Sequence, residues 1–232
     1  RVLVNEMEND IGSLIAGASR AVGVSGTTPF ASDHDLIIDA GKILTDNGAP
    51  LTDRNLVMNT SAGSNLRKLV TLSSVNTSGD SDLLRRGILG DLDGFALRES
   101  AGVNTTVAGT GAGYLVNNGA GYVVGDTAIT VDTGTGTILA GDVITVAGST
   151  AQYTVETALA ANVVTIAAPG LQAIAADNAA VTVTAAYAGN IAFHRNALQI
   201  ITRAPALPAG GDEASDRMQV VDPVTGIVFE FS

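Results

Sequence analysis

Five short stretches in the middle of the chain alternate threonine with valine or isoleucine: AITVD (128–132), DVITVAG (142–148), QYTVET (152–157), VVTIAA (163–168) and AVTVTA (180–185). A period of two with β-branched residues predicts strands, and the Gly, Asp or Asn residues between the stretches predict turns. We therefore expect a small antiparallel sandwich or barrel. Two neighbouring segments lack this rhythm: the glycine-rich segment 103–125 is expected to be loop, and 173–178 a short helical turn.

A gap in basic residues surrounds these stretches. No lysine or arginine occurs between Glu99 and His194, although the chain contains twelve of them, and its acidic residues give this block a charge of −6 out of a net −11. Such a change of composition predicts two joined parts. We expect an inserted β-rich domain at 103–187 and a discontinuous host domain made of 1–102 and 188–232.

Composition limits the classes of function. Of the 232 residues, 46% are hydrophobic but only 4% aromatic, so Val, Ile, Leu and Ala must build the core. An acidic chain without a basic stripe argues against a dedicated nucleic-acid binder, because phosphate neutralisation supplies most of that affinity. Cysteine is absent, which excludes disulfides and thiolate metal sites. No apolar run approaches the ~20 residues that span a bilayer, so we expect no membrane partner.

The flanks predict mixed α and β structure. Apolar residues at helical spacing from Leu3 to Val22 predict a long amphipathic helix that is already under way at Arg1. A second helix is expected to begin at a capping box of Ser32 and Asp35 and to end at Asn47-Gly48. Further expected elements are a strand at 55–59, a helix from 61 or 62 to 70, a helix at 80–89, strands at 95–99 and 197–203, and a terminal hairpin of 218–221 with 227–231.

Candidate chemistry is sparse. Asp132-Thr133-Gly134 follows an apolar strand as the catalytic Asp of aspartic proteases does, but one such triplet would need a homodimer, and the same residues are typical of a β-turn. His34 and His194 lack the spacing of a zinc site. The glycines at 109, 111 and 113 do not complete a phosphate-binding pattern, and no lysine follows them. We therefore predict no catalytic residue, no cofactor and no metal site.

Several segments, in chain order, resemble tailed-phage major capsid (coat) proteins of the podovirus type that carries an inserted domain. They are GTTPFAS (26–32), KILTDNGAP (42–50), NLVMNTSAG (55–63), LRRGILGDLDGFALRESAGV (84–103) and IAFHRNALQIITRAPALP (191–208). Within the middle block, GTILAGDVITVAG (136–148) is similar to the inserted domains of such proteins. The resemblance spans nearly the whole chain.

This resemblance implies an α+β fold, the Hong Kong ninety-seven phage capsid fold, interrupted by an inserted all-β small barrel or sandwich. Residues 1–22 would form the end of the spine helix of the peripheral domain, and the terminal hairpin would return to that domain. Much of 30–102 and of 191–208 would form the axial domain around the symmetry axes. The N-terminal arm and extended loop that precede the spine helix in this family are absent ahead of Arg1, so a chain that starts there is not expected to close a complete shell.

The implied function is that of a structural protein and not of an enzyme. Such a protein assembles with itself, as hexamers and pentamers, into an icosahedral shell around phage DNA without sequence-specific contacts. A scaffolding protein and a portal are its implied partners. Its implied place is the virion, the bacterial cytoplasm during assembly, or a silent prophage.

Charged residues on the helical flanks are our candidates for the assembly interface. The Arg85-Arg86 pair on a helix is most often a solvated face, but in an oligomer it could meet an acidic neighbour. The candidates are Glu6, Glu8, Arg85, Arg86 and Arg203. Two other functions stay open: a secreted or cell-surface β-rich adhesion or structural module, and, as the third choice, an aspartic-type hydrolase.

Overall fold

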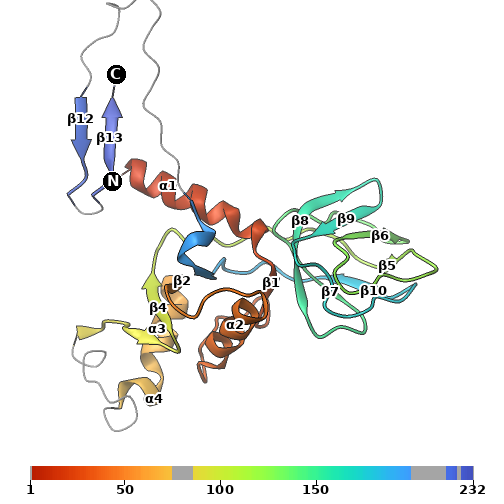
Figure 1. The fold of residues 1–232 in the computed structure, drawn as a ribbon, viewed down its shortest axis with the longest axis horizontal. Helices are drawn as coiled ribbons and strands as arrows, with labels where there is room; N and C mark the ends of the chain where they lie inside the picture. The colour runs from red at the N-terminus through yellow and green to blue at the C-terminus, as the bar shows by residue number, and fades with distance from the viewer. Residues whose placement is uncertain (1, 75–85, 200–217, 224–225, 232) are drawn as a thin grey trace, which may run out of the picture.

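The structure, a computed structural model, describes residues 2–74, 86–199, 218–223 and 226–231. Most of the regular structure lies in two bodies with separate hydrophobic clusters, one at each side of the molecule in Figure 1. One is a β-barrel, and the other, which we call the α/β body, is a four-stranded sheet with helices. Within the described residues, no helix has both the length and the apolar character needed to cross a membrane.

In the part of the chain that the structure describes, six antiparallel strands close into the barrel. The order β8-β7-β10-β5-β6-β9 returns to its start because β9 also pairs with β8. The strands are β5 (Tyr114–Val116), β6 (Ala128–Asp132), β7 (Val143–Val146), β8 (Gln152–Ala160), β9 (Val163–Ile166) and β10 (Ala180–Val183). The alternating stretches of the sequence therefore form strands as predicted, and their strand order is that of a barrel.

The barrel closes through the nine-residue strand β8. Its first residues pair with β7, as Thr154 does with Val143, and its later residues pair with β9, starting at Val155 and Ile166. Register shifts after Val155 and again after Thr157 mark irregularities that bend a strand. The inward side chains of the barrel are fully buried, among them Ile129, Val131, Ile144, Tyr153, Val155 and Val164.

Two predictions for the barrel were wrong. Tyr114–Val116 is a strand inside the segment that was expected to be loop, and it pairs with β6 and β10. Three residues are too few to show an alternating pattern, so this strand depends on partners distant in sequence. Ala175 forms an isolated bridge with Tyr122 where a helical turn was expected.

The α/β body contains a sheet in the order β11-β2-β4-β3, where β2 and β4 are parallel and the other pairs antiparallel. Its core includes Ile37, Met58, Leu66 and Phe95, which are all buried. The elements are α2 (Asp35–Asp46), β2 (Arg54–Met58), α3 (Thr60–Lys68), α4 (Val70–Ser73), β3 (Asp91–Leu92), β4 (Phe95–Glu99), β11 (Ile191–His194) and the 3₁₀ helix η2 (Arg195–Ala197).

Several predicted elements of the flanks are confirmed. Strands β2 and β4 form where expected, and α3 begins after Asn59, whose side chain accepts a hydrogen bond from the Ala62 N–H. The second helix forms, but the predicted capping box is wrong, because His34 occupies the N-cap and makes no capping hydrogen bond with its side chain. Most of the helix predicted at 80–89 lies outside the described residues, and 87–90 are not helical. In the strand predicted at 197–203, Ala197 ends η2 and 200–203 lie outside the described residues.

The first helix is shorter than predicted. Helix α1 (Val2–Ser13) is followed by a 3₁₀ turn, η1 (Leu14–Gly17), and then by a short strand, β1 (Arg20–Ala21). Strand β1 pairs with the start of β8, with Arg20 opposite Tyr153 and Ala21 opposite Gln152. Pairing with the barrel replaces the last turns of the expected helix.

The barrel is joined to the α/β body by two chain segments that run antiparallel. Thr105 bridges Ala188, and the Thr106 N–H donates to the Tyr187 carbonyl at 2.9 Å. On the β1 side, the Gln152 side-chain amide donates to the Gly23 carbonyl at 2.7 Å. The connection is therefore a paired neck reinforced by β1.

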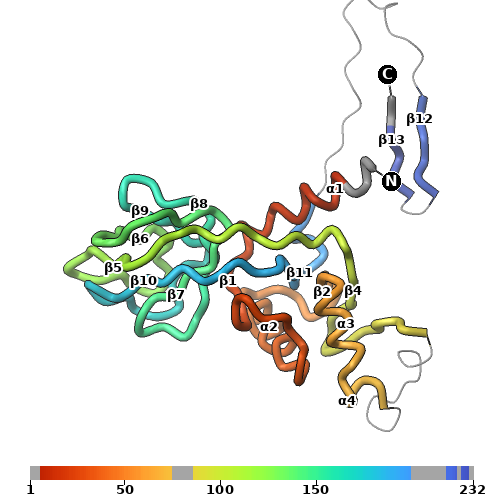
Figure 2. The backbone as a smooth tube through the Cα atoms, turned by 180° about the vertical axis from the view of Figure 1, so that it is seen from behind, coloured from red at the N-terminus to blue at the C-terminus, as the bar shows by residue number. Residues whose placement is uncertain are grey.

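A terminal hairpin stands away from both bodies, near the N-terminal end of α1 (Figures 1 and 2). It consists of β12 (Met218–Val221) and β13 (Val228–Phe231), as the sequence predicted. We refer to it as the terminal hairpin.

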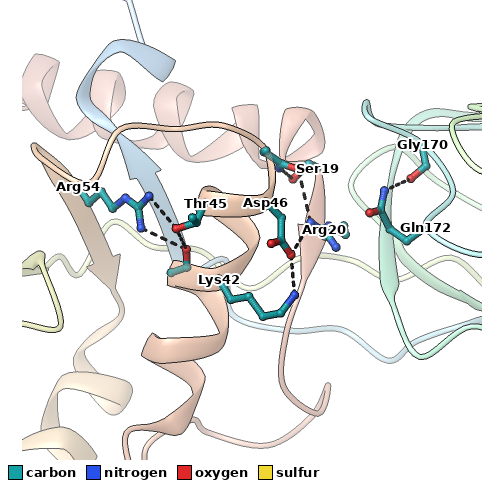
Figure 3. Close-up of polar contacts among 10 residues, drawn as sticks. Ser19, Arg20, Lys42, Thr45, Asp46, Arg54, Gly170 and Gln172 are labelled. Atoms are coloured by element: carbon teal, nitrogen blue, oxygen red, sulfur yellow. Dashed lines mark hydrogen bonds and ion pairs between the residues drawn. The ribbon is translucent and has the colours of Figure 1, made fainter.

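A buried arginine holds the α/β body together. Arg54, at the start of β2, is 5% exposed and donates to carbonyl oxygens near the C-terminal end of α2 (Figure 3). Its Nε donates to Pro50 at 2.8 Å, Nη1 to Gly41 at 3.1 Å, and Nη2 to Ala49 at 2.8 Å and to the Thr45 hydroxyl at 3.0 Å. The cation thus satisfies acceptors at the negative end of a helix dipole.

Replacement of this arginine should destabilise the α/β body more than the barrel. We expect Arg54→Met to lower its free energy of unfolding by about 3 kcal/mol, because several buried carbonyls lose a charged donor. The exposed Arg98 on β4 is the control, and Arg98→Met should change it by less than about 0.5 kcal/mol.

Two spectroscopic signals separate the bodies. Three of the four tyrosines pack in the barrel cluster, the fourth is Tyr187 in the neck, and tryptophan is absent, so tyrosine fluorescence follows the barrel. Far-ultraviolet circular dichroism follows the helices. In urea, the dichroism transition of Arg54→Met should move to lower denaturant while the fluorescence transition moves less; equal behaviour of the Arg54 and Arg98 variants would contradict this role.

Candidate functional site

The predicted interface residues are only partly placed by the structure. Glu6 and Glu8 are exposed on α1, and the Glu8 carboxylate accepts a hydrogen bond from the Ser100 hydroxyl at 3.2 Å. Glu8 therefore connects α1 to the loop that follows β4. Arg86 is exposed, whereas Arg85 and Arg203 lie outside the described residues. Their role at an interface stays a prediction.

The Asp-Thr-Gly triplet forms a tight turn at the end of β6, whose last residue is Asp132. Thr133 has a φ of 54°, and the Gly134 N–H donates to the Asp132 carbonyl at 2.6 Å. A Cβ at Gly134 would lie 2.2 Å from the Tyr114 ring, so this ring packs directly on the glycine. A turn is therefore present, but its hydrogen bond spans three residues, so it is a γ-turn and not the expected β-turn.

The histidines make local contacts. His34 Nε2 lies 3.9 Å from an Asp93 carboxylate oxygen, and His194 Nδ1 accepts a hydrogen bond from the Asn196 N–H at 3.3 Å. Within the described residues, no group of three His, Cys, Asp or Glu side chains is placed to hold a metal ion.

A buried carboxylate organises the glycine-rich loop of the barrel. Asp142 is 3% exposed, and its oxygens accept hydrogen bonds from the Gly109 N–H at 3.1 Å and from the Leu139 N–H at 2.6 Å. A side chain at residue 109 would collide with the Thr137 carbonyl, because a Cβ there would lie 2.3 Å from that oxygen. The glycine that resembled part of a phosphate loop serves instead to bring its amide to this carboxylate.

Tyr187 extends this arrangement to the neck. Its hydroxyl donates to the Gly141 carbonyl at 2.6 Å. Burial, and secondarily the negative charge of Asp142, raise the pKa of Tyr187 to about 12. The neutral phenol is therefore favoured where the barrel meets the neck.

A cleft of about 630 Å³ lies between the two bodies, and we call it the junction cleft. Its walls come from segment 14–30, helix α2, strand β11 and the barrel strands β7 and β8. The sequence analysis did not identify it, because its lining combines residues that are far apart in the chain. The sequence indicates that these segments are largely apolar, but not that they come together to form a cleft.

The terminal hairpin presents apolar side chains to solvent. Met218 is 59% exposed and Val220 is 41% exposed. They pair across the strands with Phe231 and Phe229, whereas Gln219 between them pairs with Glu230. Val221 and Val228, on the other side, are also exposed, at 56% and 54%. Since residues two apart share a face, one side takes the positions of Met218, Val220, Phe229 and Phe231, whereas the other side mixes these two valines with Gln219 and Glu230. We call the first, wholly apolar side the apolar hairpin face.

Comparison with known proteins finds a distant structural similarity. No family model matches the sequence, and no curated protein matches it. Among solved structures, a chain from Mycobacterium phage Che8 is similar, with 21% sequence identity and a TM-score of 0.40. The similarity covers 65% of this chain and 51% of that chain, so it spans about half the length of the phage protein. The likeness is to a phage protein, and at this level it supports no particular fold or activity.

The raised pKa of Tyr187 leads to a prediction about alkaline pH. In the unfolded chain a tyrosine ionises near its ordinary pKa of about 10. Between pH 10 and about pH 12, ionisation therefore lowers the free energy of the unfolded state but not that of the folded state. The contribution of Tyr187 to stability should be complete below pH 10 and be lost as the pH rises to about 12. Ultraviolet difference absorbance should show one tyrosine that titrates near 12.

Two variants test the assignment. Tyr187→Phe should remove the transition near pH 12, and Asp142→Asn should shift it toward lower pH because the neighbouring charge is gone. A transition that persists in Tyr187→Phe would show that another tyrosine is responsible.

Proposed function

We propose that the chain is the structural major capsid (coat) protein of a tailed phage or prophage, with the barrel as a domain inserted in a Hong Kong ninety-seven capsid fold. The ordered series of capsid-like segments in both flanks supports this proposal. So does the arrangement of a closed barrel that leaves and re-enters an α/β body through a paired neck. We assign no catalytic function to the chain.

The observation that carries the proposal is the apolar hairpin face. Two-stranded hairpins in water are marginally stable at best, and exposed apolar patches mark interaction sites. Yet Met218 and Val220 are exposed, and the hairpin projects from the rest of the molecule (Figure 2). Contact with another chain would bury this face and stabilise the hairpin.

We propose that the partner of the apolar hairpin face is another copy of the same protein, as in a shell built from identical subunits. A contact between two different surfaces of identical subunits produces rings or closed assemblies when the rotation between copies closes. We propose hexamers and pentamers of this chain, with a scaffolding protein and a portal as further partners. A net charge of −11 suits a wall that encloses DNA without holding it by counterion release. The virion and, during assembly, the bacterial cytoplasm would be its locations.

A pair of single substitutions on β12 tests this role. Val220→Lys places a charge on the apolar hairpin face, whereas Gln219→Lys places the same charge on the adjacent residue of the opposite face. With the complete gene product co-expressed with its scaffolding protein, we expect Val220→Lys to accumulate as unassembled subunits in sedimentation velocity. Gln219→Lys should assemble as the unmodified protein does.

The folded state of the subunits is checked separately. Circular dichroism and melting temperature of the two variants should agree, because both residues are exposed and distant from the two cores. If Val220→Lys assembles as fully as Gln219→Lys, the hairpin is not an assembly contact.

A further inference from the structure

The junction cleft has the size and composition of a small-molecule site. Such sites have volumes of about 300–1,000 Å³ and are lined mainly by apolar side chains with a few polar groups. The cleft has about 630 Å³, and its apolar lining includes Leu36, Ile43 and Leu44 from the α2 side and Ile191 and Phe193 from β11. It lies between two bodies, where ligand sites often occur.

Its charge is opposite to that of the protein. The chain has 23 acidic residues, yet none of the described residues that line the cleft is Asp or Glu. Arg20 and His194 are part of the lining. An anionic group is therefore better accommodated here than a cationic one.

Arg20 is the one side chain with a permanent charge among the described residues of the lining. The Arg20 side chain is 10% exposed, so most of it is packed against protein and only its accessible part can meet a ligand.

The remaining contacts of Arg20 only partly balance its charge. Its Nη2 lies 3.4 Å from the Asn47 side-chain oxygen and 3.9 Å from an Asp46 carboxylate oxygen (Figure 3). Asp46 is bonded more closely by Lys42, at 2.6 Å, and this hydrogen bond lowers the pKa of Asp46. The carboxylate is thus shared between two cations, which leaves Arg20 able to bind another anion.

We propose that the junction cleft binds an amphipathic carboxylate with a single alkyl chain. The alkyl chain occupies the apolar lining, and the carboxylate pairs with the Arg20 guanidinium. A peptide segment fits less well, because every residue brings a backbone donor and acceptor that need partners. This inference is independent of the proposed coat-protein function.

Calorimetric titration of the purified chain with sodium dodecanoate, below its micelle concentration, tests the proposal. We expect saturable binding at one site. Arg20→Gln should weaken it about tenfold, through loss of a charge-assisted hydrogen bond, while binding of the uncharged dodecan-1-ol changes little. Lys68→Gln, on the exposed side of α3, removes the same charge outside the cleft and should bind as the unmodified chain does.

A further variant keeps the proposal testable if Arg20→Gln does not fold. Ala40→Phe fills the cleft from α2 and should abolish binding of both ligands. Absence of saturable binding would overturn the proposal, as would equal effects of Arg20→Gln and Lys68→Gln. Binding that survives Ala40→Phe would also overturn it, since the ligand would then lie elsewhere.

Discussion

The two-sided pairing of strand β8 is the constraint on which the rest of the structure depends. Its first half pairs with β7 and its second half with β9, which closes the sheet and lets the barrel bury its own core without helices. The first residues of β8, which precede its pairing with β9, pair with β1 along the same edge. One strand therefore closes the barrel and fixes the segment after α1 beside it.

That pairing also creates the junction cleft. Because β1 is tied to the barrel, segment 14–30 crosses from one body to the other and forms one wall, while α2 and β11 form others. The neck at Thr105 and Ala188 holds the second connection. Arg20 is carried into this position by β1, which explains how a charged side chain becomes nine-tenths buried between two cores.

The sequence predicted those elements whose pattern is local. Alternating threonine and valine located β6, β7, β9 and β10, and the Asp-Pro-Val-Thr-Gly turn located the terminal hairpin. The failures concern elements that depend on distant partners. Arg20 has the spacing of a polar helix face but pairs with Tyr153, and Tyr114–Val116 is too short to be recognised without β6 and β10. Arg54 and Asp142 become buried, and the junction cleft forms, only when segments distant in the chain meet in the fold. The interface candidates Glu6, Glu8 and Arg86 were predicted from their charge alone.

Our central proposal is that this chain is a shell subunit that has a barrel inserted in its fold. Cryo-electron microscopy of the complete gene product, co-expressed with its scaffolding protein, tests it most directly. The account predicts closed icosahedral particles whose subunit density contains the barrel joined to the α/β body by the neck, with the terminal hairpin in contact with a neighbouring copy. A product that stays monomeric under all assembly conditions would contradict it.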